Sequence, residues 1–145
     1  MKKYFIVITL LGFHACISKD NLKPIVPGYV IHSNSSKIWL VDQLIEEDKN
    51  LAPKLNERKT TFTFFEDNTV FVQPLGKLGT HIGEKGSYSF NFEPNAQDTL
   101  LRIYLENKEH IKFQVKSITD KKMNLLFTAD EVTQEWRLIS YPKPF

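Results

Sequence analysis

The sequence is poor in features that would cross-link the chain, carry it across a membrane or attract nucleic acid. Its 145 residues include one cysteine, so no disulfide can form within the chain, and burial and hydrogen bonding must stabilise the fold. No apolar run reaches the ~20 residues that a membrane-spanning helix needs. The 19 Lys and Arg residues nearly balance the 17 Asp and Glu residues, without a basic stripe. We therefore expect one domain with a hydrophobic core and no nucleic-acid partner.

Recognisable catalytic and metal-binding patterns are also missing from the sequence. There is no Gly-x-Ser-x-Gly motif, and the histidines beyond the N-terminal segment are single and widely spaced (His32, His81 and His110). The adjacent acids at residues 46–48 are more typical of a solvated surface than of a calcium site. The glycines between residues 76 and 86 lack the strand–turn–helix order of a dinucleotide-binding motif, and predict a long rim loop, available as a lid or a protein contact. We expect no enzyme activity, no cofactor and no metal.

The N-terminal segment carries the most specific signal in the chain. Lys2 and Lys3 precede an apolar stretch at residues 4–11, and the single cysteine, Cys16, follows shortly after. This arrangement has the charge and length of a secretion signal, and its ending on a cysteine resembles a bacterial lipoprotein signal. The resemblance implies that residues 1–15 are removed and that Cys16 carries fatty acyl chains, such as palmitate, that anchor it in a membrane. Ile17 rather than Asp follows the cysteine, which by the same resemblance favours the outer membrane.

The alternative is an ordinary signal peptide that leaves Cys16 as a free thiol. We favour acylation because an unpaired thiol is a liability in an oxidising compartment. Each acyl CH₂ adds about 0.8 kcal/mol of membrane affinity, so several chains on one residue make a stable anchor. Residues 16–36, rich in Asn, Ser, Pro and Gly, are then predicted to be a tether, with residues 29–31 available to pack on the domain. Removing the two signal lysines leaves 17 basic and 17 acidic residues, so the mature chain has no net charge.

From residue 37 onwards, polar and apolar side chains alternate in short segments. This period of two is typical of strands with one buried face, and turn-forming residues separate the segments. Residues 42–58, which are charged and contain Pro53, are the one stretch with room for a helix. The predicted strands cover residues 37–41, 61–64, 70–72, 88–92, 101–105, 111–115, 123–127 and 132–138. About eight strands with short connections favour an all-β, antiparallel up-and-down barrel over residues 37–145, with a β-sandwich as the alternative.

Several short motifs in this region resemble those of the bacterial lipocalin-like lipoproteins. Lys-Ile-Trp at residues 37–39 stands where the family has Gly-x-Trp, an acidic turn follows an aromatic strand within residues 64–70, Gly-Ser-Tyr begins at residue 86, and Trp-Arg-Leu occupies residues 136–138. The resemblance covers residues 37–141 and implies a lipocalin-like barrel in which Arg137 lies against Trp39. A guanidinium over an indole ring, worth about 1–2 kcal/mol when partly desolvated, would close one end of the barrel. Alternatively, Trp39 is an ordinary core residue and Arg137 is solvated.

The inward faces of the predicted strands are rich in large aromatic side chains. These candidate ligand-facing residues are Phe62, Phe64, Tyr88, Phe90, Phe92, Phe113, Phe127 and Trp136. An eight-stranded barrel holds either side chains alone or one small ligand, and so many rings favour filling of at least one end. We expect a non-enzymatic outer-membrane protein that binds a small apolar ligand or a partner protein. The alternative is an accessory subunit of an outer-membrane assembly that uses its rim loops and residues 42–58 as contacts.

Overall fold

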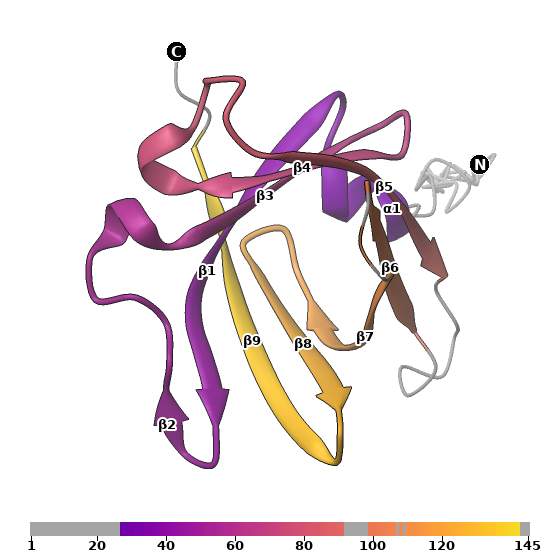
Figure 1. The fold of residues 1–145 in the computed structure, drawn as a ribbon. Coiled ribbons are helices and arrows are strands. Elements are labelled where there is room, and N and C mark those ends of the chain that lie inside the picture. Colours follow the sequence, from indigo (N-terminus) through magenta and orange to yellow (C-terminus); the bar gives the residue numbers. More distant parts are fainter. Residues whose placement is uncertain (1–26, 92–98, 107, 109, 143–145) are drawn as a thin grey trace, which may run out of the picture.

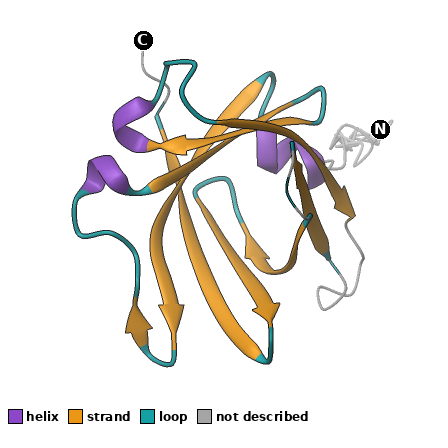
Figure 2. Ribbon diagram, in the orientation of Figure 1, coloured by secondary structure: helices purple, strands orange, loops and turns teal. Residues whose placement is uncertain are grey.

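The strands of this protein close into a barrel (Figure 1). The computed structural model describes residues 27–91, 99–106, 108 and 110–142. Strands make up most of the fold, with the helical turns at its periphery (Figure 2). The elements are α1 (Pro27–His32), β1 (Ser36–Glu46), β2 (Lys49–Asn50), the 3₁₀ turn η2 (Asn56–Arg58), β3 (Thr60–Phe65), β4 (Thr69–Pro74), the 3₁₀ turn η3 (Leu75–Lys77), β5 (Glu84–Asn91), β6 (Leu100–Leu105), β7 (Ile111–Ile118), β8 (Lys122–Ala129) and β9 (Val132–Tyr141).

Antiparallel pairing of sequential strands builds the barrel wall. β1 pairs with β3, and each later strand pairs with the next as far as β9. β9 then pairs with β1, from Ile38 opposite Tyr141 to Glu46 opposite Gln134, and closes the sheet without leaving an edge. The short β2 extends only the end of β1. The fold is therefore all-β with a closed, eight-stranded antiparallel barrel, which confirms the predicted fold class and excludes the β-sandwich.

β1 is longer than the alternating sequence pattern predicts. It continues to Glu46, so the segment with room for a helix begins as a strand. After a register shift at Asp42, pairing with β9 gives the backbone groups of Gln43 to Glu46 a partner strand, and this outweighs the low strand propensity of the two carboxylate residues, Asp42 and Glu46. A tight turn at Glu47 and Asp48, both with positive φ, then leads into β2. The only helical structure in residues 42–58, all of which the structure describes, is the single turn η2.

The loop at residues 75–83 packs against the barrel wall. Gln73, buried near the end of β4, donates hydrogen bonds from Nε2 to the backbone oxygens of Lys77 and Ile82, the latter at 3.3 Å. Gly83 is required where the loop returns, because a Cβ there would lie 2.7 Å from the backbone oxygen of Val72. The loop is therefore attached to the wall at Lys77 and Ile82, so the expectation of a flexible rim loop is wrong there, while a role as a lid or a protein contact stays a prediction.

The core is one continuous cluster that receives side chains from all eight barrel strands. Its buried members are Ile31, Trp39, Val41, Phe62, Phe64, Val70, Tyr88, Leu101, Ile103, Leu105, Phe113, Val115, Met123, Leu125 and Leu138. Partly buried Val72, Phe90, Ile111, Ile118, Phe127 and Trp136 pack against them. Along the strands these residues occur at every second position, as the period of two requires, except in β7, where a register shift separates Val115 from Ile118 by three residues.

One core residue, Ile31, comes from the segment that the sequence predicts to be a tether. Its side chain is 0% exposed, and its backbone oxygen accepts a hydrogen bond of 2.9 Å from Nε1 of Trp39. Tertiary packing of this kind stabilises a helix as short as α1, which would not form alone. Residues 27–36 therefore belong to the folded domain. Burial of Ile31 confirms the expected packing of residues 29–31 on the domain, whereas the assignment of residues 27–36 as a whole to a tether is wrong. Residues 16–26, including Cys16, lie outside the described residues.

Candidate functional site at the uncapped end of the barrel

α1 covers the end of the barrel at which β1 begins, which we call the capped end. Lys37 holds this end together: its Nζ lies 4.4 Å from the ring centroid of Trp39 and donates hydrogen bonds to the backbone oxygens of Val30, at 3.2 Å, and of Asp120. Burial lowers the pKa of Lys37, and the negative charge of Asp120 partly offsets this effect. One side chain thus connects α1, β1 and the turn between β7 and β8.

The predicted contact between Arg137 and Trp39 is wrong. Trp39 lies opposite Ser140 on β9, whereas Arg137 lies opposite Gln43 and is 45% exposed at its side chain. Both sequence neighbours of Arg137 face the core, so strand alternation directs the guanidinium outward. There, Nε donates to Glu135 Oε1 at 2.9 Å and Nη1 donates to Gln43 Oε1 at 3.1 Å. The bond from Arg137 lowers the pKa of Glu135. The cation over Trp39 is instead Lys37, which occupies the glycine position of the family motif.

The structure confirms the inward placement of the predicted aromatic residues that it describes. Phe62, Phe64, Tyr88 and Phe113 are buried, and Phe90, Phe127 and Trp136 are partly buried against the same cluster. Phe92 lies outside the described residues. Contact of these rings with a ligand stays a prediction.

Six of the rings form a connected network across the barrel, which continues from Phe62 through Phe64 to Tyr88. The Trp136 ring lies 5.3 Å from Phe113 in a T-shaped arrangement and 6.2 Å from Phe62, and Phe113 lies 5.8 Å from Phe127, as ring-centroid distances. Such pairs add about 0.5–1.5 kcal/mol each beyond their area burial. These rings occupy space inside the barrel, so they stabilise the fold without any ligand.

The opposite end of the barrel is formed by the β1–β2 and β8–β9 hairpins, which project at the bottom of Figure 1. α1 lies at the other end, and the 3₁₀ turns η2 and η3, which precede β3 and follow β4, contain no buried residue, so we call this the uncapped end. Leu44 faces Trp136 across the β1–β9 pair, and Phe127 is partly exposed. Val132, on the same face of β9 as Trp136, is 42% exposed. We define the uncapped end by these four side chains, which present apolar surface to solvent.

A short chain of polar side chains orients the indole at this end. Trp136 Nε1 donates to Gln134 Oε1 at 3.1 Å, and Gln134 Nε2 donates to Glu46 Oε2 at 2.6 Å. Fixing the ring before a ligand arrives reduces the entropy lost on binding. The sequence analysis missed Gln134 and Glu46. The available signal was the position of Gln134, two residues before Trp136 and hence on the same strand face.

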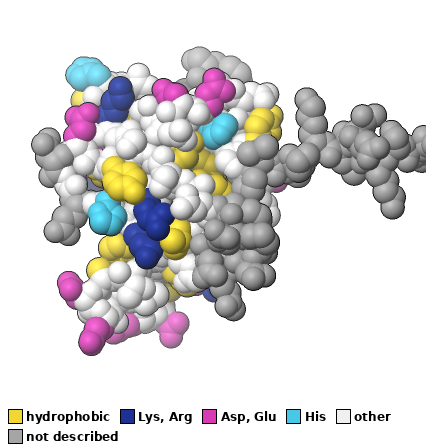
Figure 3. Space-filling model, turned by 90° about the vertical axis from the view of Figure 1, so that its right-hand side faces the viewer, with side chains coloured by type: hydrophobic (Ala, Val, Ile, Leu, Met, Phe, Trp, Pro, Cys, Tyr) yellow, Lys and Arg dark blue, Asp and Glu magenta, His cyan; other side chains and the backbone are white. Residues whose placement is uncertain are grey.

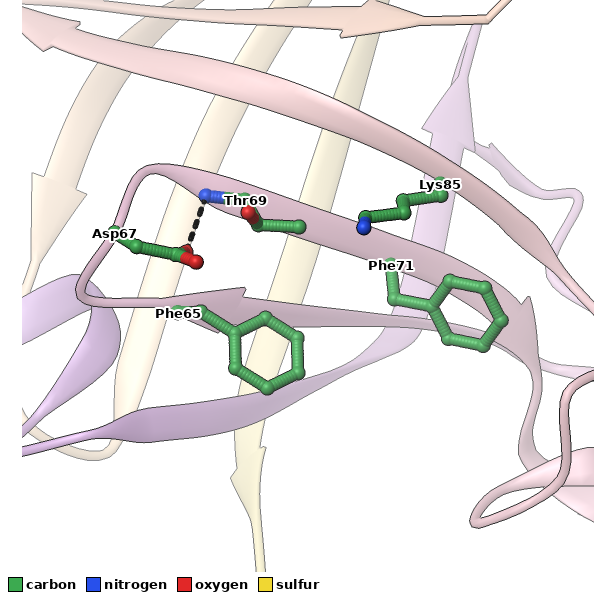
Figure 4. A pocket seen from close by; sticks show the side chains of 5 residues that line it. All are labelled: Phe65, Asp67, Thr69, Phe71 and Lys85. Atoms are coloured by element: carbon green, nitrogen blue, oxygen red, sulfur yellow. Dashed lines mark hydrogen bonds between the residues drawn. The ribbon is translucent and has the colours of Figure 1, made fainter.

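A shallow hollow of about 290 Å³ lies on the outer wall over β3, β4 and β5. In Figure 4 the rings of Phe65 and Phe71 project from neighbouring strands, with the Lys85 amine beside Phe71. Asp67 Oδ1 accepts a hydrogen bond of 2.9 Å from the backbone N–H of Thr69, and this bond lowers the pKa of Asp67. Its open shape and its mixture of rings and charges are typical of a surface contact.

The described residues hold no group of three or more His, Cys, Asp and Glu arranged to bind a metal. In the same part of the chain, every helix is too short or too polar to span a membrane. No protein-family model, curated protein or solved structure matches the chain.

Proposed function

We propose that this protein is a non-enzymatic, lipid-anchored protein of the outer membrane whose barrel binds an apolar group at the uncapped end. The observation that carries the proposal is the difference between the two ends. α1 and Lys37 cover one end, whereas Phe127, Val132 and Trp136 leave apolar surface exposed at the other. The bound group is a small apolar molecule or an apolar side chain of a partner protein.

The packed rings limit how deeply such a group enters the barrel. Phe62, Phe113 and Trp136 already contact one another below the uncapped end. An apolar group that covers about 150 Å² of the exposed surface gains roughly 4 kcal/mol, which corresponds to a Kd near 1 mM. Tighter binding needs a larger contact or an effectively raised local concentration, and anchoring at a membrane supplies the second.

The anchor in this proposal is acylated Cys16, followed by residues 17–26 and then the folded domain. Its support is the lone cysteine shortly after a short apolar segment with two N-terminal lysines. Acylation also removes the one thiol of the chain from oxidative chemistry.

Binding of a neutral apolar fluorophore, N-phenyl-1-naphthylamine, tests the uncapped end. The Cys16→Ser protein is titrated with the fluorophore, and so is the same protein with Val132→Asp. A carboxylate at position 132, on the same face of β9 as Trp136, should weaken binding about tenfold or more, because it must be desolvated. Leu55→Asp is the matched control, since Leu55 is 60% exposed in the segment after β2, and it should leave binding unchanged. Equal affinities of the two variants would contradict the proposal.

Two further measurements separate a small molecule from a partner protein. Native mass spectrometry of protein extracted from its own membranes detects a small apolar ligand as an added mass. A photo-crosslinking amino acid at position 132 in intact cells captures a partner protein instead. If neither an added mass nor a specific crosslink is found, binding of a small molecule and binding of a partner protein at the uncapped end are both contradicted.

The second candidate is an accessory subunit of an outer-membrane assembly. The observation in its favour is the exposure of Leu51 and Leu55, 50% and 60%, in the segment between β2 and β3. A crosslink from position 55 but none from position 132 would favour this function over binding at the uncapped end.

A further inference from the structure

The outer face of β6 and β7 brings together two cations and two aromatic rings, which we call the basic wall: Arg102, Tyr104, His110 and Lys112. Arg102 lies directly opposite Lys112 in the strand pairing. Tyr104 is 43% exposed, and its ring is stacked with that of His110 at a centroid distance of 5.7 Å. Figure 3 views this side of the molecule and shows Lys and Arg side chains grouped near its centre, beside a histidine and hydrophobic side chains. Arg102 and Tyr104 come from β6, Lys112 comes from β7 and His110 directly precedes β7, so no basic stripe is visible in the sequence.

This placement of Arg102 and Lys112 opposes the stability of the isolated fold, because like charges directly opposite on neighbouring strands repel each other. No carboxylate among the described residues forms an ion pair with either of them. The residue opposite Arg102 on the other side, in β5, is the uncharged Ser89. The acids Glu84 and Glu135 of the same sheet pair with other cations. An external anion would relieve the repulsion.

The short connection between Cys16 and α1 limits how far the domain can lie from the membrane, whose lipid headgroups are a source of anions. Residues 16–26 form a connection of eleven residues, which spans at most about 40 Å when fully extended. A domain of this size is itself roughly 30–35 Å across. An anchor at Cys16 therefore keeps the domain within about its own diameter of the bilayer. Figure 1 shows α1, at which this connection ends, on the same side of the barrel as β5 and β6.

We propose that the basic wall rests on the anionic phospholipid headgroups of the membrane that holds the anchor. This inference rests on the lipid anchor of the proposed function, and it adds the orientation of the domain on the membrane. Arg102 and Lys112 supply charge complementary to the phosphates, and Tyr104 places an amphipathic ring at the headgroup level, where such rings are enriched.

Co-sedimentation with vesicles tests this inference without the anchor. The full chain with Cys16→Ser is mixed with vesicles of phosphatidylglycerol and phosphatidylethanolamine, or of phosphatidylcholine alone. Each cation near an anionic surface raises partitioning about fivefold, so the double substitution Arg102→Gln and Lys112→Gln should lower binding to the anionic vesicles about 25-fold. Binding should also fall in high salt, which screens the attraction.

A charge-matched control is Lys49→Gln with Lys54→Gln, which removes two exposed cations from β2 and the segment after it. Equal losses in the two double variants, or equal binding to both kinds of vesicle, would overturn the inference. The Arg102→Gln and Lys112→Gln protein should also unfold at an unchanged or higher temperature, because the like-charge repulsion is gone, so weak binding cannot be attributed to unfolding.

The lipid anchor and the basic wall can be tested independently of each other. In intact cells, acylated protein with Arg102→Gln and Lys112→Gln should remain in the membrane fraction, since acyl chains dominate attachment. Its loss from that fraction would contradict the division of roles between the anchor and the wall. Release of the Cys16→Ser protein into the soluble fraction tests the anchor alone.

Discussion

Replacing Ile31 by Ala tests whether α1 is part of the fold or part of a tether. Ile31 is 0% exposed and packs in the core cluster, so the substitution leaves a cavity at the capped end. Isoleucine-to-alanine substitutions in cores cost about 2–5 kcal/mol. A short helix at the end of a barrel can move into part of the cavity, so we expect a loss of about 2–3 kcal/mol. A residue in a tether would cost nothing measurable.

Urea unfolding of the Cys16→Ser protein, followed by tryptophan fluorescence and circular dichroism, measures this effect. With an m-value of about 1.5 kcal/mol/M, the expected loss lowers the unfolding midpoint by roughly 1.3–2 M. Tyr29→Ala is the matched control from the same helix, because Tyr29 is 47% exposed, and its midpoint should change by less than about 0.5 M. Equal midpoints for Ile31→Ala and Tyr29→Ala would refute the reasoning that α1 caps the barrel.

Three other predictions concern stability. Lys37→Met should lower the unfolding free energy by about 1–2 kcal/mol, because it removes two hydrogen bonds and the cation over Trp39. Lys37→Arg should retain most of the stability. Equal urea midpoints for wild type and Lys37→Met would contradict this role of Lys37. Arg137→Ala should lower the unfolding free energy by less than about 1 kcal/mol in the same assay, because the hydrogen bonds of Arg137 are exposed. A larger loss would contradict this exposed role of Arg137. Burial raises the pKa of Tyr88 to about 12, so the folded state keeps a proton that the unfolded state releases from about pH 10. Stability should therefore fall as pH rises from about 10 towards 12, and more steeply in wild type than in Tyr88→Phe; parallel pH profiles from urea unfolding would show that Tyr88 does not contribute.

The barrel could be predicted because its strands follow a simple physical rule. Alternation in segments such as residues 101–105 and 111–115 reflects one face in the core and one in water, and the structure places Leu101, Ile103, Phe113 and Val115 inside. Short connections then required antiparallel neighbours. The sequence did not predict α1, because Pro27 and a nearby glycine give this segment the composition of a linker. Its stability depends on a tertiary contact, the hydrogen bond from the Trp39 indole to the backbone oxygen of Ile31.

The candidate site was predictable only in part, for a related reason. Strand alternation identifies which rings face inward, but not which end of the barrel is covered. Lys37 was noticed only as a departure from a glycine motif, because its contacts with Val30 and Asp120 depend on α1 and on a turn 83 residues away. The basic wall depends on register as well: Arg102 meets Lys112 only because β6 and β7 pair as they do.

The intact mass of the protein isolated from the membrane fraction shows whether Cys16 anchors this barrel to a membrane. We expect a chain that begins at Cys16, bears the added mass of its acyl chains and loses that mass in part on mild alkaline hydrolysis of the ester-linked chains. A chain with an unmodified Cys16, or one that begins at another residue, would contradict it.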